Sequence, residues 1–198
     1  MAAGAKAVAK IKKTLVECID ILEPILGQKF KVPKTKNKGG AGHYLETILG
    51  VQHSSDCLDC SDGELKAFPL KQLKNGTLVP KETVAVTMCC IADLKTQPFT
   101  ESRVCKKLSQ VLLIPYLREG EYITFYLPEY FSASHVLWSA VEKDYLTLQE
   151  EALRNRVTGS IGEYLQTRTK GSGHGSKSRA FYLRPKFLKE VFNNIYLM

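Results

Sequence analysis

The 198-residue sequence contains no apolar run that approaches the ~20 residues needed to span a bilayer. Its first residues, MAAGAKAVAKIKK, lack an apolar block followed by a small-residue cleavage site, so we expect no signal peptide. No internal repeat is visible, and the four histidines show no metal-ligand spacing. We therefore expect an intracellular protein that is neither secreted nor membrane-bound and keeps its six cysteines reduced.

The composition is that of a folded protein with a surplus of positive charge. Hydrophobic residues make up 44% of the chain, which excludes a disordered tail, and the length predicts a single domain over residues 1–198. Residues 1–38 hold nine lysines and three acids, and residues 164–198 hold seven basic residues and one acid, so each end carries +6. Residues 39–163 carry twelve basic and sixteen acidic residues, a net charge of −4. This distribution favours a phosphate-binding surface around an acidic, cation-binding centre.

Hydrophobic periodicity predicts an α/β or α+β chain with one central mixed β-sheet. Asp62-Gly63 and Asn75-Gly76 are expected to form turns, the second of them in a β-hairpin. Helices are expected at 5–27, 42–49, 131–156 and 187–197, and strands at about 64–70, 83–92, 111–115, 121–127, 164–168 and 180–183.

The most informative segment is DCLDCSDGELK, residues 56–66, in which four acids and a lysine precede or begin a predicted strand. Residues i and i+2 share one face of a strand, so Glu64 and Lys66 should point the same way and Leu65 into the core. A nearby aspartate could join Glu64 in binding Mg²⁺, with Lys66 beside the metal. This layout suits phosphodiester hydrolysis, although Asp93-Leu94-Lys95 shows that the acid-x-Lys pattern also recurs by chance.

The cysteines offer an alternative interpretation. Cys57 and Cys60 have the spacing of half a zinc site, but such a site needs a second pair of ligands. Cys89 and Cys90 are adjacent in a predicted strand and should point to opposite faces. Structural zinc is therefore the weaker hypothesis.

Taken together, the motifs of residues 37–198 resemble the MutH family of DNA endonucleases, which includes GATC-cutting restriction enzymes. The resemblance rests on five segments in the same order: NKGGAGHYLE at 37–46, DCSDGELKAFP at 59–69, PKETV at 80–84, CKKLSQVLLIP at 105–115, and GEYLQTRTK at 162–170 with FYL at 181–183.

The resemblance implies the PD-(D/E)xK fold, a mixed sheet flanked by helices, with a catalytic core at about 37–128 and a DNA-recognition part at about 130–198. It implies that Asp59, Glu64 and the Leu65 carbonyl bind Mg²⁺, for which Mn²⁺ can substitute, and that Lys66 and Glu46 complete the catalytic site. The interval before the glutamate is shorter than in the mismatch-repair enzyme, which leaves Asp56 and Asp62 as alternatives to Asp59. The expected DNA contacts are Lys38, Lys106, Lys107, Arg168, Lys170, Lys177, Arg179, Tyr182 and Arg184.

The expected function is Mg²⁺-dependent, sequence-specific cleavage of double-stranded DNA, with no small-molecule substrate. The strongly basic ends favour a type II restriction enzyme that acts as a homodimer on a short palindrome such as GATC. The alternatives are a strand-nicking mismatch-repair endonuclease and a DNA-binding subunit without catalysis.

Overall fold

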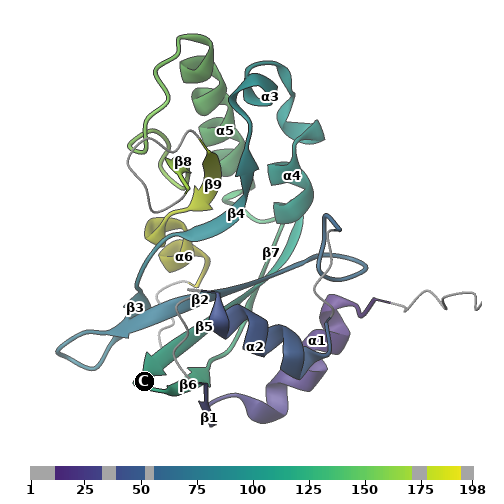
Figure 1. Cartoon of the computed structure of the whole chain (residues 1–198), viewed down its shortest axis with the longest axis vertical. Coiled ribbons are helices and arrows are strands. Elements are labelled where there is room, and N and C mark those ends of the chain that lie inside the picture. Colours follow the sequence, from purple (N-terminus) through teal and green to yellow (C-terminus); the bar gives the residue numbers. More distant parts are fainter. Residues whose placement is uncertain (1–11, 33–38, 52–55, 171–177, 193–198) are drawn as a thin grey trace, which may run out of the picture.

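A six-stranded mixed sheet forms the centre of the computed structural model, which describes residues 12–32, 39–51, 56–170 and 178–192 (Figure 1). Its strand order is β1-β6-β5-β2-β3, with β7 also paired to β5. The two central strands, β2 and β5, are parallel, and the other pairs are antiparallel. The strands are β1 (Lys29–Lys31), β2 (Glu64–Gln72), β3 (Leu78–Pro80), β5 (Gln110–Glu119), β6 (Tyr122–Phe125) and β7 (Glu129–Ser132).

A second, three-stranded antiparallel sheet corrects the expectation of one sheet. It contains β4 (Val84–Cys89), β9 (Arg179–Leu183) and β8 (Leu165–Thr169), in that order. β4 pairs with β9, almost a hundred residues further along the chain, rather than with the strands next to it in sequence. Such long-range pairing is not specified by any local pattern, so the sequence alone could not separate the two sheets.

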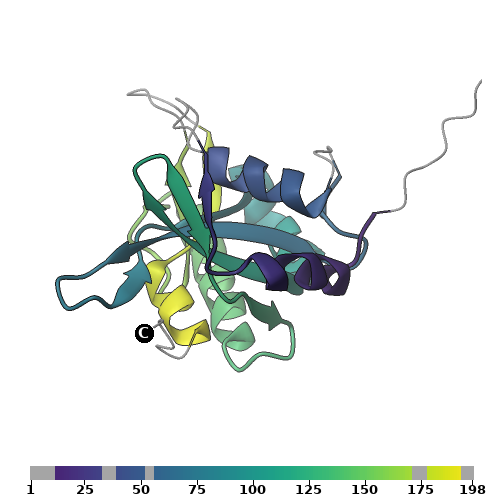
Figure 2. The same cartoon turned by 90° about the horizontal axis from the view of Figure 1, so that it is seen from below.

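Helices cover both faces of the main sheet (Figure 2). Leu112 and Ile114 of β5 pack in one core with the helices α1 (Leu15–Leu22) and α2 (Gly40–Leu49). Val111 and Leu113 face the opposite core, because side chains alternate along a strand. That core is closed by α3 (Ile91–Thr96), the 3₁₀ turn Phe99–Glu101, α4 (Arg103–Leu108), α5 (Trp138–Leu153) and α6 (Pro185–Val191).

The N-terminal helix is shorter than the predicted 5–27. In the described part it begins at Leu15, and it gives way at Glu23 to a 3₁₀ turn, Glu23–Ile25. The Thr14 hydroxyl accepts from the Glu17 backbone N–H at 3.2 Å, and the Glu17 carboxylate accepts from the Thr14 N–H at 2.7 Å. This capping box fixes the start of the helix. The prediction is too long because it rests on apolar periodicity, which carries no information about caps. Residues 5–11 lie outside the described chain.

Other predicted elements are confirmed with shifted ends. The expected helix at 131–156 is wrong at its start, because Phe131 belongs to β7 and pairs with Val111 of β5. The strand expected at 83–92 ends at Cys89, since α3 follows directly. The last helix begins at Pro185, where proline suits the first helical position, and residues 193–197 lie outside the described range.

The remaining strand predictions agree with the structure, as does the Asn75-Gly76 hairpin, which joins β2 to β3. The predicted α/β class with a central mixed sheet flanked by helices, the layout expected of the PD-(D/E)xK fold, is confirmed. Among the described helices, none combines the length and the apolar character that crossing a membrane requires.

Candidate active site

Glu64 is the buried carboxylate at the start of the central strand β2. Its side chain is 1% exposed, and it forms an ion pair with Lys66, two residues further along the strand. Leu65 packs on the other side of the sheet, in the core formed with α1 and α2. The period-two prediction, with Glu64 and Lys66 on one face and Leu65 in the core, is therefore confirmed.

A second lysine reaches the same carboxylate from another element. Lys107 of α4 places its Nζ 2.6 Å from Glu64 Oε1, the oxygen that Lys66 also contacts, and is only 15% exposed. Two ammonium groups offset the cost of burying one carboxylate, since a buried charge needs partners. The sequence indicated a basic helix here but not that one of its lysines meets Glu64, so Lys107 was assigned to DNA contact alone.

The second oxygen of the Glu64 carboxylate differs from the first in its contacts. Glu64 Oε2 is buried and has no hydrogen-bond partner among the described residues. Asp59 lies at the same strand, because its Oδ2 accepts from the Leu65 N–H at 3.1 Å. In an extended strand the N–H and C=O of one residue point to the same side, so the Leu65 carbonyl faces the side on which Asp59 lies. The Asp59 carboxylate and the Leu65 carbonyl thus lie on one side of β2, at the residue that follows Glu64.

This set of oxygens fits Mg²⁺ better than zinc. Mg²⁺ keeps several waters and is usually bound by one or two carboxylates together with substrate phosphates. Zinc sites need three or four protein ligands, commonly cysteine or histidine. Within the described ranges no group of three or more His, Cys, Asp or Glu side chains could hold a metal. Cys60 instead contacts Cys18 of α1, with 3.6 Å between the sulfur atoms.

The two alternative aspartates are engaged elsewhere. Asp56 pairs with Lys12, with 2.9 Å between Nζ and Oδ2. Asp62 Oδ1 accepts from the Leu15 N–H at 2.8 Å, at the start of α1. Asp59 is the member of this cluster that bonds to β2, which supports the preference for it as the residue beside Glu64.

Glu46 lies on α2, which packs against β2 on the face opposite the Glu64 side chain. It is half-buried, and its Oε2 is 3.4 Å from His43 Nδ1 one turn earlier on the helix. Its expected contribution to the catalytic site stays a prediction.

A cavity of about 620 Å³ brings Lys66 together with residues from the far end of the chain. Arg168 and Lys170, both exposed on or just after β8, line it, as does the half-buried Tyr182 of β9. The cavity is therefore shared by the predicted catalytic lysine and three of the predicted DNA contacts. The remaining wall comes from residues of β2, β4, β5 and β8, from the start of α2, and from the segments just before α2 and β4.

The other predicted DNA contacts are placed differently. Lys106 is exposed on α4. Arg179 donates to the Thr167 carbonyl at 3.1 Å, and Arg184 donates to the Gly159 carbonyl at 2.9 Å. Arg179 thus joins β9 to β8, and Arg184 joins the end of β9 to the segment before β8. Their contacts with DNA stay a prediction. Lys38 and Lys177 lie outside the described residues.

Asp144 of α5 is a buried polar residue that the sequence patterns did not single out. Its carboxylate accepts from three successive backbone N–H groups, those of Glu163 at 2.8 Å, Tyr164 at 2.6 Å and Leu165 at 2.8 Å. The bonds fix the start of β8, the strand that carries Arg168 to the cavity. An acid on a helix is usually solvated, so only the tertiary fold shows this role.

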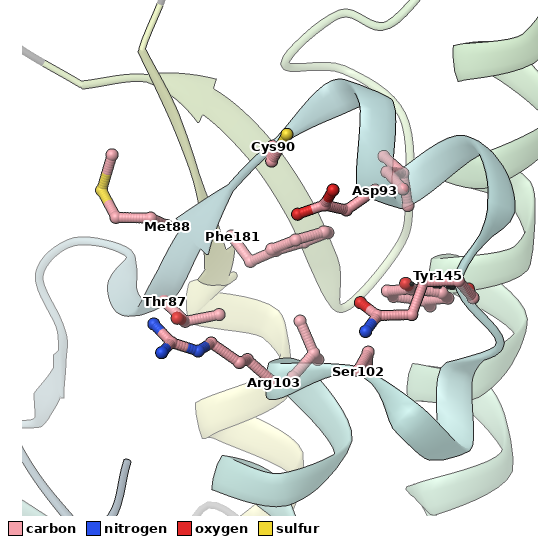
Figure 3. Close-up of a pocket in the computed structure, with 11 residues that line it drawn as sticks. Thr87, Met88, Cys90, Asp93, Ser102, Arg103, Tyr145 and Phe181 are labelled. Atoms are coloured by element: carbon pink, nitrogen blue, oxygen red, sulfur yellow. Dashed lines mark hydrogen bonds between the residues drawn. The ribbon is translucent and has the colours of Figure 1, made fainter. Parts of the chain in front are cut away.

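A smaller cavity of about 270 Å³ lies between β4, α3, α4 and α5. Figure 3 shows the Asp93 carboxylate directed into it, above Phe181, with Tyr145 on the side of α5. None of the predicted site residues lines it. Asp93 and Lys95 stand on a helix rather than a strand, where residues i and i+2 do not share a face, so this second acid-x-Lys pattern forms no pair like that of Glu64 and Lys66.

Comparison with known proteins finds a matching family, similar relatives and a similar solved structure. The family described as "DNA mismatch repair enzyme MutH" matches residues 48–151. The DNA mismatch repair protein MutH of Histophilus somni (strain 2336) is 30% identical over 186 residues, 80% of each chain, and that of Vibrio cholerae serotype O1 (strain M66-2) is 29% identical over 188 residues, 81% of this chain and 82% of the relative. A solved complex of the restriction endonuclease MvaI with its cognate DNA aligns with 89% of this chain and 94% of its own, at a TM-score of 0.46 and 14% identity.

Proposed function

Because the chain belongs to the MutH family of endonucleases, we propose that it hydrolyses phosphodiester bonds of double-stranded DNA with Mg²⁺ as cofactor. One observation carries the proposal. Glu64 is buried, holds two lysines on one oxygen, and has its other oxygen without a hydrogen-bond partner among the described residues, while Asp59 bonds to the next residue of β2. A protein that only bound DNA would gain nothing from acids placed next to phosphates.

The proposed roles follow from the chemistry of each group. Asp59, Glu64 and the Leu65 carbonyl hold the metal, for which Mn²⁺ can substitute. When bound, Mg²⁺ would supply Lewis-acid polarisation of the scissile phosphate and a lowered pKa for water. Lys66 and Lys107 keep two positive charges at the same place, where they orient the attacking water and offset the charge that develops on the phosphate. Glu46 of α2 is proposed as a further acidic residue of the catalytic site.

The proposed recognition surface is the cavity that Lys66 shares with the second sheet. Arg168 and Lys170 carry charge suited to phosphate or to the O6 and N7 atoms of guanine, a pairing worth about 1–3 kcal/mol of base discrimination. Tyr182 adds an aromatic surface on the same wall. Outside this wall, Lys106 and the basic ends of the chain are proposed to bind backbone phosphates.

Two modes of cleavage are candidates. The basic ends support a type II restriction enzyme, which would need two copies of the chain to cut both strands of a palindrome such as GATC, since the described residues form one such centre per chain. The mismatch-repair names of the two relatives, which cover most of this chain, favour a second candidate, nicking of a single strand.

Cleavage of supercoiled plasmid tests the function and separates the two modes. We expect cleavage with Mg²⁺ or Mn²⁺, none in EDTA, and none by Glu64→Gln, while Glu101→Gln, an exposed glutamate outside the site, cuts like wild type. Linear product supports the restriction mode and open-circular product the nicking mode, and sequencing the ends gives the site. Wild-type cutting by Glu64→Gln would refute the assignment, and DNA binding without cleavage in either metal would favour a non-catalytic subunit.

A further inference from the structure

Asp62 caps the N-terminus of α1, although it lies 47 residues after Leu15 in the chain. Leu15 is the first residue of α1, so its N–H is among the donors that a helix leaves without an internal partner. Asp62 Oδ1 accepts this N–H at 2.8 Å, and a negative charge at a helix N-terminus is favourable. Thr14 serves a different donor of the same turn, the Glu17 N–H.

The loop that contains Asp62 is joined to the start of α1 along its whole length. We call residues 56–63 the acidic loop and residues 12–18 the bracing segment. Lys12 pairs with Asp56 at 2.9 Å and donates to the Leu58 carbonyl at 2.5 Å. The Ser61 N–H donates to the Lys13 carbonyl at 2.9 Å.

Two further contacts close the arrangement. Cys60 meets Cys18 in the core, with 3.6 Å between their sulfur atoms. Gly63 lies so close to the Leu15 side chain and to the Gln110 carbonyl that a Cβ there would overlap both. Within the acidic loop, one backbone hydrogen bond runs from the Cys60 N–H to the Gly63 carbonyl, at 2.9 Å. The shape of the loop therefore depends mainly on its contacts with the bracing segment.

Asp59 sits in the middle of this loop. The residue before it, Leu58, is held by Lys12, and the residue after it, Cys60, is held by Cys18. Asp59 itself turns the other way and accepts from the Leu65 N–H of β2. Its position at the start of β2 thus depends on a loop whose anchors lie in the bracing segment.

We propose that Asp62 is a positioning residue, which caps α1 and thereby keeps the acidic loop in the shape that presents Asp59 to the metal. The inference rests on the proposed function, because it takes Asp59 as the metal ligand. It also assigns Asp62, an alternative metal ligand by sequence, to a different task.

Helix capping and Mg²⁺ binding respond differently when an aspartate is replaced by asparagine. An asparagine at position 62 still offers an oxygen to the Leu15 N–H, so Asp62→Asn should keep the cap. Asp62→Ala removes the cap. A neutral side chain at a true Mg²⁺ ligand removes charge that the ion requires, so Asp59→Asn should abolish cleavage.

The experiment is single-turnover cleavage at saturating DNA as a function of Mg²⁺ concentration. For Asp62→Ala we expect the half-saturating Mg²⁺ concentration to rise by about 10-fold or more, as when groups that orient metal ligands are removed, with unchanged DNA affinity. Asp62→Asn should keep the wild-type midpoint. Asp20→Ala, which removes an exposed acid from α1 away from the loop, is the matched control and should also keep it.

A purely structural role would lower the active fraction without moving the Mg²⁺ midpoint, so an unmoved midpoint in Asp62→Ala overturns the proposal. Loss of cleavage in Asp62→Asn with retention in Asp59→Asn also overturns it, because Asp62 would then bind the metal. If Asp62→Ala does not fold, Lys12→Met, which releases Asp56 and Leu58, should raise the midpoint in its place. Wild-type cleavage by both Asp59→Asn and Glu64→Gln would instead refute the proposed function.

Discussion

Lys107 Nζ lies 2.6 Å from Oε1 of Glu64, a residue 43 positions earlier in the chain, and joins α4 to the start of β2 at the candidate active site. Replacing Lys107 with alanine removes a positive charge from this buried carboxylate. We expect Lys107→Ala to lower the single-turnover cleavage rate by about 10²-fold or more, the effect of removing one charge-stabilising donor. DNA affinity, measured by fluorescence anisotropy, should fall only slightly.

Lys106→Ala is the matched control, because Lys106 is the adjacent lysine on the same helix and is exposed. Lys106→Ala should lower the affinity for DNA and make that affinity less dependent on salt concentration. The cleavage rate at saturating DNA should stay unchanged. Equal loss of cleavage rate in both variants would mean that the two lysines act only on DNA, and that the contact with Glu64 is irrelevant to the reaction.

Mg²⁺ should stabilise the fold in the absence of DNA, because the oxygen of Glu64 without a described hydrogen-bond partner would gain a ligand. At a concentration of 100 times its dissociation constant, an ion that binds only the folded state adds about 2.7 kcal/mol to the free energy of unfolding. Thermal or urea unfolding with and without Mg²⁺ measures this gain. Glu64→Gln should lose it, with sodium chloride of matched ionic strength as control, and a gain retained in Glu64→Gln would contradict the assignment of the site.

Gly63 is required by packing. A Cβ at this position would lie 2.7 Å from the Gln110 carbonyl, a backbone atom that cannot move without shifting β5. Gly63→Ala should therefore cost about 1–3 kcal/mol of stability, as overpacking of a close contact does. Gly42→Ala is the control, since a Cβ there meets no atom within 4 Å. Equal unfolding midpoints for the two variants would show that the contact relaxes freely.

Asp144→Ala should destabilise the protein strongly. It would leave three N–H groups at the start of β8 without their acceptor, at a cost of at least about 2 kcal/mol in urea unfolding. Asp144→Asn keeps one acceptor oxygen and should lose less. Because β8 carries Arg168, we also expect weaker DNA binding by Asp144→Ala at temperatures where it is still folded. A stability equal to wild type would show that water replaces the carboxylate.

The adjacent cysteines Cys89 and Cys90 should differ in reactivity. Burial raises the pKa of the Cys89 thiol to about 12, whereas Cys90 is exposed. Iodoacetamide at neutral pH should label Cys90 and spare Cys89 in the folded protein, as read by peptide mass spectrometry. Labelling of both at equal rates would contradict the placement of Cys89.

The same shift gives a pH dependence of stability. The unfolded thiol loses its proton near its ordinary pKa of 9.0, while the folded thiol keeps it to about 12. The unfolded state therefore binds fewer protons between these values, and stability falls as pH rises through this window. Cys89→Ala should be less stable overall but lose less of its stability between pH 9 and pH 12. Identical slopes for the two proteins would count against the raised pKa.

Much of the fold follows from local patterns. Asn75-Gly76 predicts its hairpin because few residues other than glycine and asparagine adopt the backbone that such a turn needs, and Gly76 has φ of +87°. The period-two pattern predicts that Glu64 and Lys66 share a face. The sequence also contains the Thr14–Glu17 capping box, which marks the start of the N-terminal helix at Leu15. The predicted range is too long because it rests on apolar periodicity alone.

What local patterns could not supply is the meeting of distant segments. β4 joins β9 in a separate sheet, Phe131 pairs with β5, and Lys107 reaches Glu64, each through pairing or packing over long sequence distances. The same holds for Asp144, whose three bonds connect α5 to β8. Long-range contacts of this kind depend on the whole chain, so a helix or strand propensity carries no trace of them.

Asp59, Glu64 and Lys107 come from a loop braced by α1, from the central strand and from a later helix, and no short stretch of the chain contains them all. With the proposed function, a half-synthesised or partly unfolded copy would retain its lysines and could adhere to DNA, but it would have no assembled centre with which to cut. The ability to cut DNA would then require all three segments to be folded together. Dispersal of the candidate site over the chain would thus confine cutting to fully folded copies.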